Sequence, residues 1–151
     1  MNNPTSASAI LKTCRTPPIS ISPTATVRAA IRSMVAAGVG AVVAVQDDAL
    51  VGILTERDVM VKVSDRALDP DRLLVEEIME RNVRTVGPEV SHSRAATLML
   101  THHCRQLPVV DEAGKVLGTL SVRHLYREQL RRLRGQMDSL ESYMLADGPG
   151  G

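Results

Sequence analysis

The feature that most constrains the fold of this chain is an internal repeat. Residues 21–34 match residues 86–99, with Pro23 opposite Pro88, at an offset of 65 residues. Two later pieces of each half also align, 42–45 with 107–110, and 52–55 with 118–121 at an offset of 66. A repeat of this size cannot bury its apolar face alone, so we expect the two copies to pack against each other.

Each half has the pattern of a strand, a helix and a hairpin, followed by a second helix. The elements expected in the first half are a strand at 19–22, a helix from Val27 that Thr26 caps and Gly38 ends, and strands at 41–45 and 50–54. The second half repeats this order after a polar linker, 64–72, and a helix, 73–80. The expected fold class is therefore mixed α/β (α+β), with two β-α-β-β-α units packed sheet to sheet and clefts at their junction.

Composition excludes several classes of protein. A net charge of +1 over 151 residues argues against a surface built to hold nucleic acid. The longest apolar run, 41–45, is far too short to cross a membrane. Two cysteines without a secretory signal lead us to expect reduced thiols and a cytoplasmic location. Phe and Trp are absent, so the core must be aliphatic.

The first half contains one motif whose side chains could bind a ligand. In Gly52-Ile-Leu-Thr55-Glu-Arg-Asp58, a strand ends in a hydroxyl and a carboxylate follows three residues later. A carboxylate can accept two hydrogen bonds from the diol of a ribose, and a hydroxyl at a helix start suits a phosphate, to which Arg57 would add charge. The alternative is that Thr55 and Asp58 only cap the helix.

This motif resembles the CBS-domain signature, and it occurs twice in register within matching repeats. The resemblance extends from near Lys12 to near Arg127, about four-fifths of the chain. It implies a stand-alone tandem CBS pair, which is a regulatory module without catalysis that binds an adenine nucleotide or related ligand between its repeats. The expected parts are a flexible start at 1–9, repeat one at 10–66, repeat two at 73–127, a C-terminal amphipathic helix at 128–146 and a flexible tail at 147–151.

The resemblance also implies which residues line the two clefts. In the first cleft, Thr55, Arg57 and Asp58 would face a group from the second repeat: Asn82, Val83, Cys104, Arg105 and Gln106. In the second cleft, Ser121 and Arg123 would face Pro17, Val39, Gly40 and Ala41.

The second copy of the motif departs from the family at one position, where His124 stands in place of Asp. Imidazole cannot hold a diol as a carboxylate does. We therefore expect the Asp58 cleft to be the better nucleotide site and the Ser121 cleft to be empty, weaker or suited to another ligand. The alternative for His124 is a solvated residue in the first turn of a helix.

The C-terminal region predicts a helix that needs a partner. Its apolar residues follow at alternating spacings of four and three, namely Tyr126, Leu130, Leu133, Met137, Leu140 and Met144. They could lie against their own domain or in a homodimer. A stripe of arginines at 123, 127, 131 and 134 is expected to be a solvated face, because acidic residues interleave with it.

The sequence therefore favours a sensor of AMP, ADP or ATP that signals to a partner protein. S-adenosylmethionine and dinucleotides remain open as ligands, and the regulated partner is unidentified. The alternative function is a ligand-free dimeric scaffold that works through its C-terminal helix; contact with RNA or DNA is less favoured. The run His102-His103-Cys104 does not predict a metal site, since no second ligand cluster completes it. No catalytic cofactor or nucleophile–base set is expected.

Overall fold

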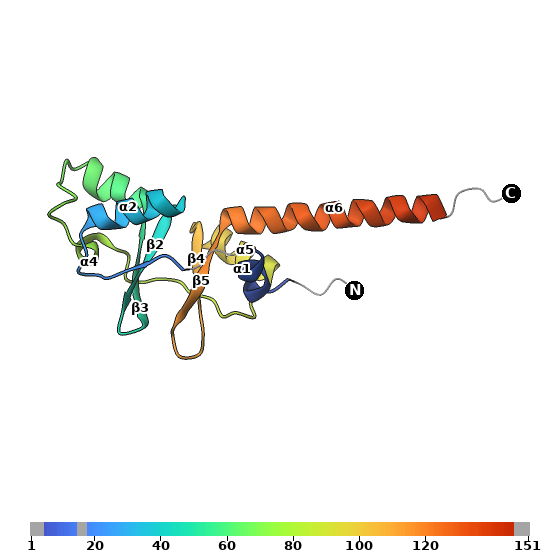
Figure 1. The fold of residues 1–151 in the computed structure, drawn as a ribbon, viewed down its shortest axis with the longest axis horizontal. Coiled ribbons are helices and arrows are strands. Elements are labelled where there is room, and N and C mark those ends of the chain that lie inside the picture. Colours follow the sequence, from blue (N-terminus) through green and yellow to red (C-terminus); the bar gives the residue numbers. More distant parts are fainter. Residues whose placement is uncertain (1–4, 15–17, 147–151) are drawn as a thin grey trace.

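A computed structural model describes residues 5–14 and 18–146 of the chain. The described residues form two small sheets with helices around them, and one long helix extends beyond this body (Figure 1). In chain order the elements are α1 (Ala7–Cys14), β1 (Ser20–Ile21), α2 (Val27–Ala37), β2 (Ala41–Gln46), β3 (Ala49–Thr55), α3 (Glu56–Asp58), η1 (Val59–Ser64), α4 (Val75–Ile78), α5 (His92–Thr101), β4 (Gln106–Val110), β5 (Val116–Ser121) and α6 (Val122–Ala146).

The first repeat folds as its sequence predicts. The sheet has the order β1-β2-β3, with β1 parallel and β3 antiparallel to β2. Thr26 caps α2 by accepting a hydrogen bond from the Ala29 N–H, and Gly38 ends it with φ of 64°. The hairpin turns at Asp47 and Asp48, whose φ values of 50° and 62° are of the kind that tight hairpins require and that Asp tolerates.

The second repeat has the same hairpin but a shorter first strand. Val86 forms only an isolated parallel bridge with Val109, where the first repeat has the strand β1. The physical reason is Pro108, which stands where the first repeat has Val43. The Val43 N–H donates to the Ile19 carbonyl at 3.0 Å, and proline has no N–H to make the equivalent bond.

Each repeat is completed by the segment that precedes the other repeat. Backbone bridges join Ser6 to Ser91 and Thr26 to Leu74, so the start of the chain pairs with the second repeat and the linker pairs with the first. Figure 1 shows the result, with α1 beside β5 and the start of α6, and α4 beside β3. The sequence did not predict this exchange.

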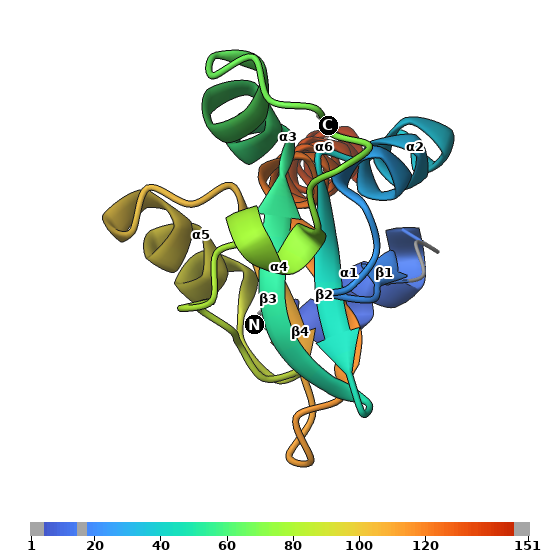
Figure 2. The same ribbon diagram turned by 90° about the vertical axis from the view of Figure 1, so that its left-hand side faces the viewer.

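The apolar core follows the same exchange. One cluster contains residues of the first repeat together with Val75, Ile78 and Met79 from the linker. A second contains residues of the second repeat together with Ala7 and Ile10 from α1. A third lies between the two sheets and comprises Ala41, Val43, Ile53 and Val116. The expectation of two repeats packed sheet to sheet is therefore confirmed; Figure 2 shows β2 and β3 lying across β4.

The glycine of each motif makes room for the exchanged segment. A Cβ atom on Gly118 would lie 2.8 Å from Leu11 Cδ1 and 2.9 Å from Leu11 Cδ2. A Cβ atom on Gly52 would overlap the Met79 side chain in the equivalent place. These glycines thus allow the exchanged segments to pack closely against the strands.

The first prediction concerns this contact. Gly118→Ala should destabilise the protein by about 1–3 kcal/mol, because the added methyl group overpacks the contact with Leu11. Chemical denaturation measures the change, and Gly87→Ala, which adds a Cβ with no heavy atom within 4 Å, is the matched control. The double variant Gly118→Ala/Leu11→Ala should lose less stability than the two single losses added together; strict additivity would contradict the contact.

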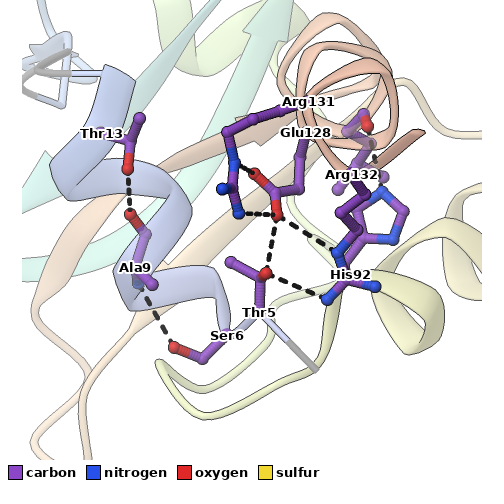
Figure 3. A network of polar contacts seen from close by, with 9 residues as sticks. Thr5, Ser6, Ala9, Thr13, His92, Glu128, Arg131 and Arg132 are labelled. Carbon is purple, nitrogen blue, oxygen red and sulfur yellow. Dashed lines mark hydrogen bonds and ion pairs between the residues drawn. The ribbon is translucent and has the colours of Figure 1, made fainter. Parts of the chain in front are cut away.

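A buried carboxylate fixes α6 to the body. Glu128 Oε1 accepts hydrogen bonds from Thr5 Oγ1 at 2.6 Å and from Arg131 Nη2 at 2.8 Å, and Arg132 lies 3.3 Å from the same oxygen (Figure 3). On the neighbouring turn, His92 Nε2 donates to the Leu125 carbonyl at 3.0 Å. The face of α6 that carries Leu125 and Glu128 therefore points into the body.

This network predicts a pH dependence of stability. The hydrogen bond from Arg131 is the main cause that lowers the pKa of Glu128 from 4.5 to about 2. Because the folded pKa lies below the unfolded one, its contribution is complete above pH 4.5 and is lost as the pH falls towards 2. Glu128→Gln should cost about 2 kcal/mol at pH 7, since charged hydrogen bonds are lost.

Denaturation at pH 7 and pH 3 measures this effect. The wild type should lose more stability on acidification than Glu128→Gln does. Glu112→Gln, at an exposed carboxylate of the β4–β5 turn, should behave as the wild type. Equal acid sensitivity of the wild type and Glu128→Gln would show that the network does not stabilise the fold.

Candidate ligand site

The two motifs bring their hydroxyl residues to equivalent strand ends. Thr55 ends β3 opposite Ala41, and Ser121 ends β5 opposite Gln106. Each strand then turns directly into a helix. The backbone supports both turns in the same way, because the Glu56 N–H donates to the Gly40 carbonyl at 2.9 Å and the Val122 N–H donates to the Arg105 carbonyl at 3.1 Å.

The Asp58 carboxylate is already bonded within its own motif. Its Oδ2 accepts hydrogen bonds from the Thr55 N–H at 2.9 Å and from Thr55 Oγ1 at 2.7 Å, while the Asp58 N–H donates to Thr55 Oγ1 at 3.2 Å. Its Oδ1 pairs with Lys62 Nζ at 2.8 Å, and Lys62 also donates to the Ile78 carbonyl. Burial opposes ionisation, but the bonds from Lys62 and Thr55 outweigh it and lower the pKa of Asp58. The helix-capping role is thus present, and any diol would have to share this carboxylate.

His124 takes the place of the carboxylate in the second motif. The Ser121 N–H donates to His124 Nδ1 at 3.2 Å, and the His124 N–H donates to Ser121 Oγ at 3.3 Å. Only an unprotonated Nδ1 can accept this bond. Burial is the main cause that lowers the pKa of His124, and the charge of Arg127 lowers it further. His124 is half-buried and performs the capping role that Asp58 performs in the first motif.

A cavity of about 700 Å³ lies beside Ser121, between the two repeats. This is within the usual range of small-molecule sites. The wall from the first repeat is mainly apolar and includes Ile19, Met34 and Val39. The wall from the second repeat is polar and basic, and its members include Arg105, Gln106, Ser121, Arg123, His124 and Arg127.

One carboxylate faces this mainly cationic cavity. Glu56 lines it and lies over Gly40, since a Cβ atom on that glycine would be 3.2 Å from Glu56 Cδ. The described lining residues therefore offer an apolar surface, several guanidinium groups and one carboxylate acceptor. These groups suit an amphipathic anion that also carries hydroxyl groups.

The structure separates the residues expected in the first cleft. Arg105 and Gln106 line the cavity beside Ser121, whereas Thr55, Arg57 and Asp58 are not among its lining residues. The other three lie elsewhere: Asn82 is exposed, Val83 packs against the cluster between the sheets, and Cys104 packs against the second-repeat core, where burial raises the pKa of its thiol.

The residues expected in the second cleft come together. Val39, Gly40, Ala41, Ser121 and Arg123 all line the cavity. Pro17 lies outside the described residues, and its neighbour Pro18 is a lining residue.

Sequence reasoning missed Glu56 and Arg127 as lining residues. Arg127 lies one helical turn after Arg123, a spacing that places two residues on the same helix face. Glu56 is the residue that the 66-residue offset places opposite Val122, another lining residue. Val122 was not itself a candidate residue, so the repeat offset alone would not have found Glu56.

The described part of the chain contains neither a group of metal ligands nor a helix suited to a membrane. Within residues 5–14 and 18–146, no three side chains of His, Cys, Asp or Glu are grouped so that they could hold a metal ion. Among the helices described, none combines the length and the apolar character needed to cross a membrane.

Comparison with known proteins identifies relatives of both repeats. The family model of the CBS domain matches residues 7–65 and 75–131. A crystal structure of a CBS domain superposes with a TM-score of 0.79 at 31% identity, covering 85% of this chain and 99% of that one. A CBS domain protein from Pyrobaculum aerophilum, solved as a complex with AMP, superposes with a TM-score of 0.72 at 28% identity, covering 80% and 89%.

Several curated relatives are longer than this chain. An uncharacterized protein from Methanopyrus kandleri is 36% identical over 89 residues, which is 58% of this chain and 45% of that protein. An inosine-5'-monophosphate dehydrogenase from Korarchaeum cryptofilum is 34% identical over 111 residues, which is 73% of this chain but only 22% of the enzyme. The similarity to the dehydrogenase comes from its CBS domains.

The Ser121–His124 cap predicts a second pH effect. Because the folded pKa of His124 is lowered from 6.5, its contribution is present above pH 6.5 and is lost as the pH falls below that value. His124→Asn keeps an acceptor that does not titrate. Between pH 7.5 and pH 5.5, chemical denaturation should show a larger loss of stability for the wild type than for the variant. Identical losses would mean that His124 does not accept this bond.

Proposed function

Because the chain belongs to the CBS domain family, we propose that it is a regulatory module that binds an adenine nucleotide in the cavity beside Ser121 and signals to a partner protein. A CBS pair is a regulatory module. The observation that carries the finer proposal is the contrast between the two cavity walls. An adenine base suits the apolar wall and a phosphate suits the arginines.

Different polar groups of the cavity would bind different parts of the nucleotide. Arg123 and Arg127 project from the first turns of α6, where they would pair with phosphate oxygens. Glu56 would accept hydrogen bonds from ribose hydroxyls, the role that the sequence assigned to Asp58. The AMP complex of the Pyrobaculum aerophilum protein supports this ligand class.

Signalling would follow from the position of the cavity. A ligand that touches both repeats stabilises one arrangement of the repeats over others, because it binds that arrangement better. Arg123 and Arg127 belong to the helix that extends from the body, so the same ligand would also bias α6. The partner protein would recognise the favoured arrangement. We also propose that the protein acts as a homodimer.

A second candidate function is a dimeric scaffold that works through α6 without a ligand. The observation that favours it is the exposed apolar seam of this helix, in which Leu130 is 45% exposed and Met144 is 73% exposed. A seam of this kind is unusual on a helix that has no partner.

Calorimetric titration of AMP, ADP, ATP and S-adenosylmethionine into the purified protein tests the proposal. At least one adenine nucleotide should bind with a stoichiometry near one per chain. Arg123→Glu should weaken this binding at least tenfold, about 1.4 kcal/mol, because it replaces a phosphate partner with a repelling charge. Arg94→Glu, a charge reversal on the exposed face of α5, should bind as the wild type does.

Asp58→Asn distinguishes the two clefts. Binding that survives this change but is weakened by Arg123→Glu places the nucleotide beside Ser121. Binding that is lost in Asp58→Asn and kept in Arg123→Glu would move the site to the first cleft. If none of the four ligands produces heat with folded protein, the scaffold is the better description.

A further inference from the structure

The exposed seam of α6 continues for most of the length of the helix. It consists of Tyr126, Leu130, Leu133, Met137, Leu140 and Met144, whose exposure ranges from 45% at Leu130 to 73% at Met144. These residues alternate at spacings of four and three, which keeps them on one face of a helix that pairs with another. The second half of α6 extends away from the body (Figure 1).

The body and the seam use different faces of α6. Leu125 and Glu128 are buried against the body, and Arg132 joins them through its bonds to Glu128 and Thr5. At 100° per residue, this face is separated by about 120° from the face of Tyr126 and Leu133. Docking on the body therefore leaves the seam free along its whole length.

We infer that the occupant of the seam is the α6 helix of a second copy, paired antiparallel. The register that brings the seams together places Tyr126 opposite the partner's Met144. It also places Leu130 opposite the partner's Leu140, and Leu133 opposite the partner's Met137. The six seam residues then form continuous apolar layers. The inference rests on the dimer proposed above and specifies how that dimer is built.

The charges of α6 favour the antiparallel direction. Its first half carries five arginines against one acidic residue, Glu128, and its second half carries Asp138 and Glu141; the arginines are Arg123, Arg127, Arg131, Arg132 and Arg134. A parallel pair would set the arginine-rich halves side by side, whereas an antiparallel pair sets each beside an acidic half. Arg127 and Glu141 each directly follow a seam residue, so they flank the same side of the seam and would meet across the pair. Arg134 would meet its own copy at the centre, as the single like-charge contact on that flank.

The length of the helix fits this register. α6 ends at Ala146, which would lie opposite the partner's His124, close to where α6 begins. Almost the whole helix is therefore covered, and neither end extends past the other helix. The partner's Glu141 would also bond Arg127, a lining residue of the cavity. Dimer formation would thereby place a group from one copy at the rim of the other copy's cavity.

Disulfide trapping tests the direction of the pair. In a background with Cys14→Ala and Cys104→Ala, two single variants are made, Tyr126→Cys and Met144→Cys. Neither alone should form a disulfide-linked dimer under oxidation, because each cysteine faces a different residue of the partner. An incubated mixture of the two variants should give a reducible band at twice the chain mass of 16.3 kDa. Self-linking of either variant alone would overturn the antiparallel arrangement.

Light scattering tests whether the seam makes the dimer. The wild type should be a dimer, and Leu133→Glu/Met137→Glu should be a folded monomer, as judged by its circular dichroism melt. Ser142→Glu adds a negative charge away from the seam and should stay dimeric. A dimer that persists in the seam variant would place the contact on the repeats and overturn the inference while leaving the proposed dimer intact. A monomeric wild type would overturn both the seam contact and the proposed dimer. The calorimetric titration tests nucleotide binding independently of the oligomeric state.

Discussion

The exchange of segments between the repeats is the constraint on which the rest of the structure depends. Residues near the start of the chain complete the core of the second repeat, and the linker completes the core of the first. Each repeat needs the segment that precedes the other repeat to complete its core, so the two repeats must fold as one unit. Gly52 and Gly118 show how close this packing is, because neither position has room for a Cβ atom beside Met79 or Leu11. A separate apolar cluster, which includes Val43 and Ile53, lies between the two sheets, and the cavity lies between the two repeats.

The cavity acquires two unlike walls because the repeats are similar in fold but different in sequence. The start of β2 contributes Val39, Gly40 and Ala41, whereas the equivalent start of β4 contributes Arg105 and Gln106. Symmetric positions of the backbone thus present aliphatic surface on one side and a guanidinium group on the other. A small ligand with one apolar end and one anionic end matches this arrangement in a single orientation, which a symmetric cavity would not impose.

Much of this fold could be predicted because the sequence pattern of each element occurs in both repeats. The strands, the hairpins and the caps at Thr26 and Gly38 follow from local spacing and from turn chemistry that acts within a few residues. The shortened first strand of repeat two was also available in principle, since Pro108 cannot donate a hydrogen bond. The exchange of segments was not, because it depends on contacts such as Ser6 with Ser91 that no local pattern encodes. The side chains lining the cavity were accordingly predicted only where the family resemblance placed them, and Glu56 was missed.

The replacement of Asp by His in the second motif changes the charge of the site while it preserves the turn. Asp58 and His124 both accept the N–H of the preceding hydroxyl residue, so either side chain completes the cap. They differ in what they contribute to the space beyond it. Asp58 brings a negative charge that Lys62 neutralises locally, whereas a neutral His124 adds no negative charge beside Arg123 and Arg127 on the cavity wall. The departure from the family pattern that argued for a weaker second cleft therefore removes a repelling charge from the place where we propose that a phosphate binds.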